Sequence, residues 1–168
     1  MSEEENKALV RRLVEDWQAG HRPEVAREIL ADDFIDRTGP VEYGAKEAGI
    51  GWFSYMWQAF PDFSVTIKLQ IAEGDMVATL KTFSGTHKGE FMGIPPTGKH
   101  VAFDVFDMLR VRDGHVVEHW NVQDDAALMT QLGAPASGGG DTDPQPKISI
   151  RDVVAATPRP IGHATPVL

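Results

Sequence analysis

The hydrophobic pattern of this 168-residue chain changes its period at Phe63. Before Phe63, apolar residues recur about every 3.6 residues, which is typical of amphipathic helices. After it, apolar and polar residues alternate, which is typical of half-buried strands. Helices followed by a series of strands indicate an α+β fold.

Three helices are predicted before the change, at residues 2–19, 23–36 and 45–60. The first has Ser2 as its N-cap, acidic residues in its first turn and a glycine stop. The second begins with a proline in its first turn. The third is apolar nearly all round, so we expect other elements to cover most of it, and Pro61 ends it.

Four strands are predicted after the change, at residues 63–72, 76–87, 100–111 and 115–123. Short turns and one longer loop join them in series, which favours an antiparallel meander. A sheet with helices on one side can curl around them and leave a concave space that side chains or a ligand must fill. A last short helix is expected up to Gly133, capped by Asp124.

The domain is expected to comprise residues 1–133. Residues 134–146 are mainly Ala, Pro, Ser, Gly and Asp, the composition of a flexible linker. The tail at 147–168 contains the alternating stretch KISIRDVV. This stretch predicts either an arm that docks on the domain or on a second subunit, or a frayed terminus.

Composition narrows the classes of partner. The net charge of −9 disfavours nucleic acid, and the absence of cysteine excludes disulfides, thiol nucleophiles and thiolate metal sites. No apolar run approaches the roughly 18 residues of a membrane span, and the acidic start lacks the features of a signal peptide. We therefore expect a cytoplasmic protein with no membrane partner. His115 and His119 would lie about 13 Å apart on a strand, so no metal site is expected.

Polar residues interrupt the predicted hairpin, and its turn has two possible forms. A three-residue turn with a left-handed Gly114 would pair Asp107 with His119. The same surface of the sheet would then carry Phe103, Val105, Leu109 and Asn121. A two-residue turn would instead pair Asp107 with Trp120.

The first form of the turn predicts a mainly apolar pocket with a few convergent polar groups. A carboxyl group in such a pocket is desolvated, so the pKa of Asp107 should rise and allow it to donate or shuttle a proton near neutral pH. The alternative is that Asp107 and His119 form a solvated pair on an open face of the sheet.

Two motifs, GTHKGEFMGIPPTGK and DGHVVEHW, carry a family resemblance. From about Lys7 to Gly133, the chain resembles the SnoaL-like polyketide cyclases, or ester cyclases, of the nuclear transport factor 2-like superfamily. The resemblance implies a cone-shaped, highly curved antiparallel sheet that helices close, with a pocket inside the cone. It also implies an intramolecular aldol condensation of a hydrophobic polyketide-like substrate, or an isomerisation, without metal or cofactor.

The resemblance also implies roles for individual residues. Asp107, in DMLRV, matches the aspartate that acts as general acid and base in the characterised cyclases. His87, in GTH, resembles a histidine that lies near the substrate, and His119 should point inward as in the related isomerases. Both histidines have a structural role as the alternative.

The wall that holds the substrate is expected to include aromatic residues of the helices. Trp17, Trp52 and Phe53 are the candidates, although such residues also form ordinary cores. Asp36 stands at a binding position where the family often carries His or Asn. This departure argues against an anthracycline-type ester as the substrate.

Two other functions fit the same fold. An epoxide hydrolase would need an Asp-Arg-Asp network that holds a water molecule, and the expected placement of Asp107 and Arg110 on opposite faces counts against it. A non-catalytic ligand-binding or dimerisation module would fill the cone with its own side chains. A homodimer, or a higher homo-oligomer, that forms through the outer sheet face is expected from the family, and the tail from Lys147 could add to it.

Overall fold

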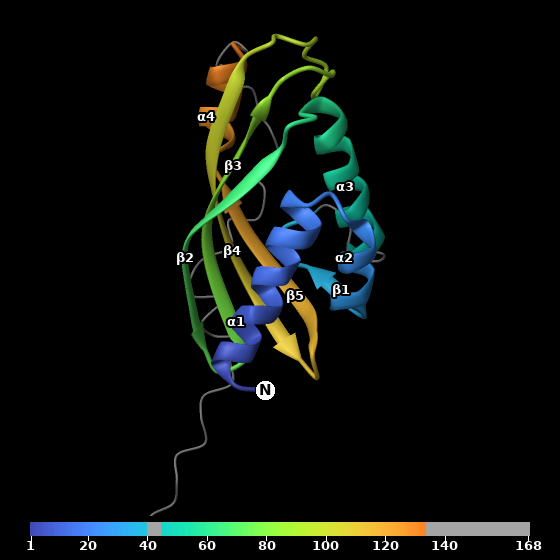
Figure 1. The fold of residues 1–168 in the computed structure, drawn as a ribbon, viewed down its shortest axis with the longest axis vertical. Helices are drawn as coiled ribbons and strands as arrows, with labels where there is room; N and C mark the ends of the chain where they lie inside the picture. Colours follow the sequence, from blue (N-terminus) through green and yellow to red (C-terminus); the bar gives the residue numbers. More distant parts are fainter. Residues whose placement is uncertain (40–44, 134–168) are drawn as a thin grey trace, which may run out of the picture. The chain divides into compact units, whose positions relative to one another are not determined.

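The structure is a computed structural model that describes residues 1–39 and 45–133. In chain order its elements are α1 (Glu3–Arg12), the π-helical segment η1 (Leu13–Ala19), α2 (Pro23–Ile29), β1 (Leu30–Asp36), α3 (Ala45–Ala59), β2 (Ser64–Glu73), β3 (Met76–Thr86), β4 (His100–Arg112), β5 (His115–Gln123) and α4 (Asp125–Leu132). The linker and tail predicted at 134–146 and 147–168 lie outside the described residues. Figure 1 shows α1, α2 and α3 over one face of a curved sheet, which confirms the α+β class.

The sheet has five strands in the order β1-β5-β4-β3-β2. The four strands predicted in series are antiparallel, as expected, but β1 pairs in parallel with β5, so the sheet is mixed. The helix predicted at 23–36 is therefore wrong in its second half. Leu30 and Phe34 are both buried, and a spacing of four residues places them on one face of a helix and of a strand alike. The free edge of β5 offers hydrogen-bond partners to this backbone, and the segment becomes a strand.

The first predicted helix is confirmed, but its second half is wider than an α-helix. The Ser2 hydroxyl accepts a hydrogen bond from the Glu5 amide at 3.2 Å, which begins α1 with the expected cap. In η1 the residues Trp17 and Gln18 are both buried although they are adjacent in sequence. The indole N–H of Trp57 donates to the Gln18 carbonyl at 3.1 Å, so α3 provides a hydrogen bond to this widened turn.

The helix predicted at 45–60 is also confirmed, and its aromatic residues pack between η1 and the sheet. Ring centroids of Trp17 and Phe53 lie 4.6 Å apart, and those of Phe53 and Phe83 lie 6.0 Å apart, both edge to face. The last helix has the predicted cap, because the Asp124 carboxylate accepts from the Ala127 amide at 2.9 Å. No helix among the described residues is long and apolar enough to cross a membrane.

The turn of the β4–β5 hairpin has the second of the two forms considered from the sequence, not the three-residue form on which the pocket was predicted. Asp113 and Gly114 form a two-residue turn, with φ angles of +50° and +77°, and Arg112 faces His115 across it. Positive φ at both central residues is the conformation that matches the twist of the flanking strands. The predicted three-residue turn is therefore wrong.

The extra residue of the hairpin lies within β5 instead. The pairing shifts by one residue after Val116, so that Val117 forms a β-bulge. A two-residue turn alone would place Asp107 opposite Trp120, with His119 on the other face. Because of the bulge, Asp107 faces Asn121 instead, and His119 lies on the inner side of the sheet with Asp107.

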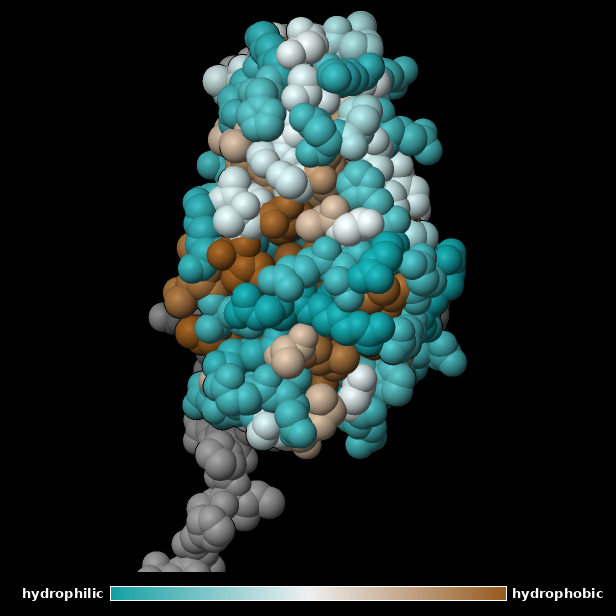
Figure 2. Space-filling view, viewed as in Figure 1, coloured by the Kyte–Doolittle hydropathy of each residue, from teal (hydrophilic) through white to brown (hydrophobic). Residues whose placement is uncertain are grey.

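One row of the outer face of the sheet is apolar across four strands. Leu69, Leu80, Phe106 and Val122 occupy directly facing positions on β2, β3, β4 and β5. Leu69 is 56% exposed and Val122 is 72% exposed. Figure 2 shows hydrophobic surface at the edge where Figure 1 places β2. The homodimer stays a prediction.

Replacing Gly114 by alanine should lower the free energy of unfolding by about 1 kcal/mol, because an alanine at this positive φ is strained. Gly51→Ala is the matched control, since a β-carbon there meets no atom within 4 Å and the helix favours alanine. Urea denaturation should show opposite signs for the two variants. Equal stability of Gly114→Ala and the unsubstituted protein would contradict the strained turn.

Candidate active site

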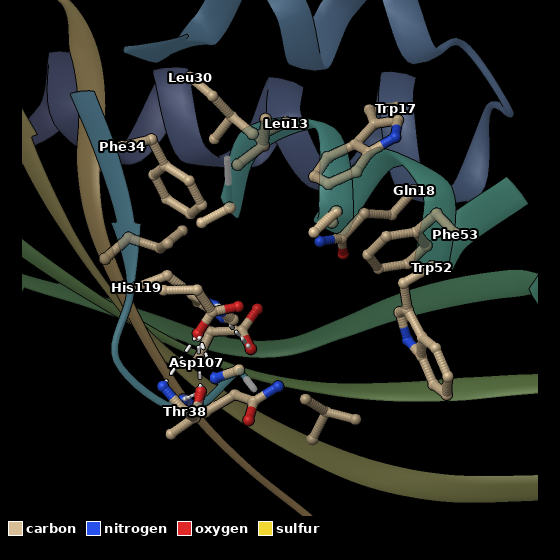
Figure 3. A pocket seen from close by; sticks show the side chains of 18 of the residues that line it. Leu13, Trp17, Gln18, Leu30, Phe34, Thr38, Trp52, Phe53, Asp107 and His119 are labelled. Carbon is tan, nitrogen blue, oxygen red and sulfur yellow. Dashed lines mark hydrogen bonds and ion pairs between the residues drawn. The ribbon is translucent and has the colours of Figure 1, made fainter. Parts of the chain in front are cut away.

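A cavity of about 630 Å³ lies between the inner face of the sheet and the helices. This volume is in the usual range of small-molecule sites. Asp107, His119 and Thr38 gather at one end of it, whereas Trp17, Trp52 and Phe53 lie at the other (Figure 3). The cavity therefore has one polar end and one aromatic end.

A buried ion pair joins β3 and β4 at the polar end. Lys81 and Asp107 are 1% and 3% exposed, and the Lys81 Nζ donates to Asp107 Oδ2. The two residues are diagonal neighbours, because Thr79 faces Asp107 in the strand register. The same Nζ donates to Gln18 Oε1 at 2.8 Å, so η1 also contacts the pair.

His119 lies between two carboxylates. Its Nε2 is 3.3 Å from Asp107 Oδ1, and its Nδ1 is 3.3 Å from Asp36 Oδ2. An ionised carboxylate only accepts hydrogen bonds, so both ring nitrogens must carry a proton if both carboxylates are ionised. This arrangement favours the imidazolium form of His119.

Asp36 is fixed by the chain that follows β1. Its Oδ1 accepts from the Thr38 amide, the Thr38 hydroxyl and the Gly39 amide, each at 3.0 Å. The Thr38 hydroxyl in turn accepts a hydrogen bond from the main-chain amide of Asn121 at 3.2 Å. Asp36 thus links the end of β1 to β5 and holds one side of the His119 ring.

Neighbouring charges shift the pKa values of Asp107, His119 and Asp36. Burial raises the pKa of Asp107, but the charge of Lys81 and the hydrogen bond with His119 outweigh it and lower that pKa to about 2. Burial lowers the pKa of His119, but its hydrogen bonds with Asp107 and Asp36 raise that pKa to about 9. Burial also raises the pKa of Asp36, and His119 and Thr38 lower it below its usual range. The raised pKa expected for Asp107 is therefore wrong, because two cations accompany the carboxylate.

Most residues predicted for the site line this cavity. They are Asp107, His119, Trp17, Asp36, Trp52, Phe53, Val105, Leu109 and Asn121. Phe103 is buried but does not line the cavity, and its ring packs on Phe83 with the centroids 5.7 Å apart. Among residues 1–39 and 45–133, no three His, Cys, Asp or Glu side chains are grouped to hold a metal ion.

His87 lies away from the cavity, in contrast to the position expected beside the substrate. It is fully buried, with its ring centroid 5.3 Å from that of Phe60. Its Nδ1 accepts a hydrogen bond from the Thr97 amide at 3.3 Å, so the ring holds the loop between β3 and β4. Burial lowers the pKa of His87, which favours the neutral ring that this contact requires.

Lys81 and Gln18 are among the polar residues of the cavity that sequence reasoning missed. The signal for Lys81 is its phase in β3, since it alternates in step with the buried Val77 and Phe83. A lysine at an inward position of a strand needs a partner, and this rule points to an inward carboxylate. Gln18 had no comparable signal, because the widening of η1 brings it inward.

The chain matches the family SnoaL-like polyketide cyclase over residues 7–132. Among curated proteins, it is similar to the aklanonic acid methyl ester cyclase DnrD of Streptomyces peucetius, with 27% identity over 135 residues. That alignment covers 76% of this chain and 90% of DnrD.

Two solved structures of Streptomyces proteins resemble this fold. AclR of Streptomyces galilaeus, provisionally described as a hydroxylase, is 33% identical with a TM-score of 0.72, over 79% of this chain and 83% of AclR. IdmH of Streptomyces antibioticus, provisionally described as a polyketide cyclase, is 32% identical with a TM-score of 0.67, over 77% of this chain and 99% of IdmH.

The raised pKa of His119 predicts how stability changes with pH. A folded-state pKa of about 9, against an ordinary value of 6.5, gives a stabilisation that is complete below about pH 6.5 and is lost towards pH 9. The free energy of unfolding should therefore fall across this range, by at most about 1.4 kcal/mol per pH unit. Urea denaturation should show a smaller fall in His119→Gln, whereas the exposed-site control His115→Gln should keep it. The same fall in His119→Gln would contradict the imidazolium assignment.

Proposed function

The chain belongs to the SnoaL-like polyketide cyclase family, and from this premise we propose that it is a cofactor-independent cyclase or isomerase. Its substrate is a hydrophobic, polyketide-like carbonyl compound. One observation carries the proposal: an ionised carboxylate, Asp107, stands at the polar end of a mainly apolar cavity, next to cationic donors.

Asp107 is the base in the proposed reaction. It removes a proton from a substrate carbon, and the electron pair of the broken C–H bond passes into an enolate. In a cyclase, the enolate carbon then bonds to a second carbonyl carbon of the same molecule, and the protonated Asp107 returns the proton to the new alkoxide. In an isomerase, the proton returns to a different carbon. No other reactant is needed in either case.

The low pKa of Asp107 limits the substrate. A carboxylate with a pKa of about 2 is ionised at every physiological pH, but it is a weak base. A proton flanked by two carbonyl groups is acidic enough for it, provided that donors stabilise the enolate as it forms. We therefore favour 1,3-dicarbonyl compounds such as β-keto esters.

The charges of the cavity favour a neutral substrate. Asp36 and Asp107 are negative, His119 and Lys81 are positive, and the four pair with one another. An added charge would have no partner among these groups, and its desolvation would be unfavourable. The aromatic end, with Trp17, would hold the apolar part of the substrate in a folded shape, which favours ring closure.

A second candidate is an epoxide-opening hydrolase. Asp36, His119 and Asp107 place one cation between two carboxylates, which resembles the Asp-Arg-Asp network with histidine in place of arginine. Arg110 itself is bound to Glu118 and Asp75, outside the cavity. A non-catalytic module is expected to fill the inside of the curved sheet with its own side chains. The cavity of about 630 Å³ counts against this alternative.

The proposal is tested by the exchange of an α-proton for deuterium in a bicyclic β-keto ester, methyl 1-oxo-1,2,3,4-tetrahydronaphthalene-2-carboxylate. At pH 5 in D₂O, the protein should accelerate the exchange over the uncatalysed rate, as followed by NMR. Asp107→Asn should lose about 10²- to 10⁴-fold of this acceleration, because the general base is removed.

Asp104→Asn is the matched control, since Asp104 lies on the same strand, on the outer face, paired with Lys68. It should exchange the probe as fast as the unsubstituted protein does. Undiminished exchange by a folded Asp107→Asn variant would overturn the base assignment. Hydrolysis of an apolar epoxide without exchange of the keto ester would favour the second candidate.

A further inference from the structure

We propose that Lys81 is a second catalytic residue, whose ammonium group donates a hydrogen bond to the substrate oxygen that becomes negative when Asp107 removes the proton. This inference rests on the proposed function and concerns the same cavity. It assigns the stabilisation of the enolate to a residue of β3, across the strand pair from the base.

The position of Lys81 supports this role. Its side chain is 1% exposed and lines the cavity, whereas lysines are almost never buried without a specific partner. Its Nζ lies 5.0 Å from the centroid of the Phe83 ring, an apolar surface that also lines the cavity. A charge that contacts so little solvent interacts strongly with any charge that forms beside it.

The hydrogen bonds of Lys81 leave room for a ligand. An ammonium group has three N–H donors. Among the described residues, Lys81 donates to Gln18 Oε1 and Asp107 Oδ2, and its third donor has no hydrogen-bond acceptor. A substrate carbonyl oxygen in the cavity can accept this third hydrogen bond.

The contact between Lys81 and Asp107 matches the geometry of enolisation. In a carbonyl compound, the carbon that loses the proton and the oxygen that gains the charge are only two bonds apart. A base and a donor that touch each other can therefore reach both atoms of one substrate. Lys81 and Asp107 are the pair in this cavity that offers a base and a free cationic donor in contact.

The charge balance also supports the role. Before proton transfer, Asp36, Asp107, His119 and Lys81 sum to zero. After transfer, Asp107 is neutral, the protein groups sum to +1, and the enolate carries −1. The cation that paired with Asp107 thus becomes the partner of the new anion, without a new charge entering the cavity.

Gln18 acts as a positioning residue in this arrangement. Its Oε1 accepts a hydrogen bond from the Lys81 Nζ at 2.8 Å, so Gln18 and Asp107 both hold the ammonium group. The Gln18 side chain points inward because η1 is widened at this turn. The main-chain carbonyl of Gln18 accepts a hydrogen bond from the Trp57 indole N–H there. The π-helical segment therefore has a consequence for the site, since it holds the ammonium group at the cavity wall.

The experiment compares two side chains at position 81 that differ in whether they carry the positive charge of lysine. The chain has no cysteine, so Lys81→Cys introduces a single thiol. Alkylating it in urea with 2-bromoethylamine gives a close analogue of lysine, and alkylating it with 1-bromopropane gives a side chain of the same length without charge. Both adducts are refolded, and near-ultraviolet circular dichroism checks their packing.

We expect the aminoethyl adduct to exchange the β-keto ester α-proton about 10²- to 10³-fold faster than the propyl adduct, the effect of one donor to a developing oxyanion. The pH profile should differ as well. Without the positive charge, the pKa of Asp107 rises, so the acid limb of the exchange rate should move to higher pH in the propyl adduct and return in the aminoethyl adduct. The shift of this limb tests the ion pair with Asp107, whereas the difference in rate above the limb, where Asp107 is ionised in both adducts, tests the hydrogen bond to the substrate.

Lys68→Cys with the same two adducts is the matched control, because Lys68 forms an exposed ion pair with Asp104 on the outer face. Its adducts should exchange the probe equally fast. Equal rates and equal acid limbs for the two Lys81 adducts would overturn the Lys81 proposal. If the propyl adduct fails to fold while the aminoethyl adduct exchanges normally, Lys81→Met provides a neutral side chain of similar length for the same comparison. Full exchange by Lys81→Met would also overturn the Lys81 proposal.

The outcome separates this inference from the proposed function. If Asp107→Asn retains exchange, the base assignment fails whatever Lys81 does. If Asp107→Asn loses exchange while both Lys81 adducts keep it, the proposed function stands and the role of Lys81 alone is wrong.

Discussion

A row of four charges inside an apolar cavity is the interaction on which the rest of this site depends. Asp36, His119, Asp107 and Lys81 alternate in sign and come from β1, β5, β4 and β3. Burying any one of them alone would cost several kcal/mol, so each is tolerated only because its neighbours are present. The row therefore joins the inner sides of four strands and determines which protonation states the cavity can use.

The chain places these groups together through two local irregularities. The bulge at Val117 turns His119 to the inner face, which the tight Asp113-Gly114 turn alone would have prevented. The widened helical turn of η1 brings Gln18 against Lys81. Bulges and π-helical turns are common beside functional sites, because each changes the direction of a side chain without changing the fold around it.

The sequence predicts the helices, the four antiparallel strands and the inner face of β4, because long stretches of regular periodicity leave little choice. It also predicts that Asp107 and His119 share a face of the sheet, although the predicted turn is wrong. An extra residue in the turn and an extra residue in β5 have the same effect, because each moves the later residues of β5 to the opposite face. It does not predict β1, because Leu30 and Phe34 fit either period. The pKa of Asp107 could not be inferred without Lys81, whose partner lies 26 residues away in the chain.

The central claim is that Asp107 and Lys81 act together on one carbonyl group of a neutral, hydrophobic substrate. A crystal structure with the β-keto ester bound would test it most directly. We predict a ligand oxygen at about 3 Å from Lys81 Nζ, the acidic carbon over the Asp107 carboxylate, and the rings towards Trp17 and Phe53. A ligand bound with its carbonyl groups at the aromatic end, away from Lys81 and Asp107, would contradict it.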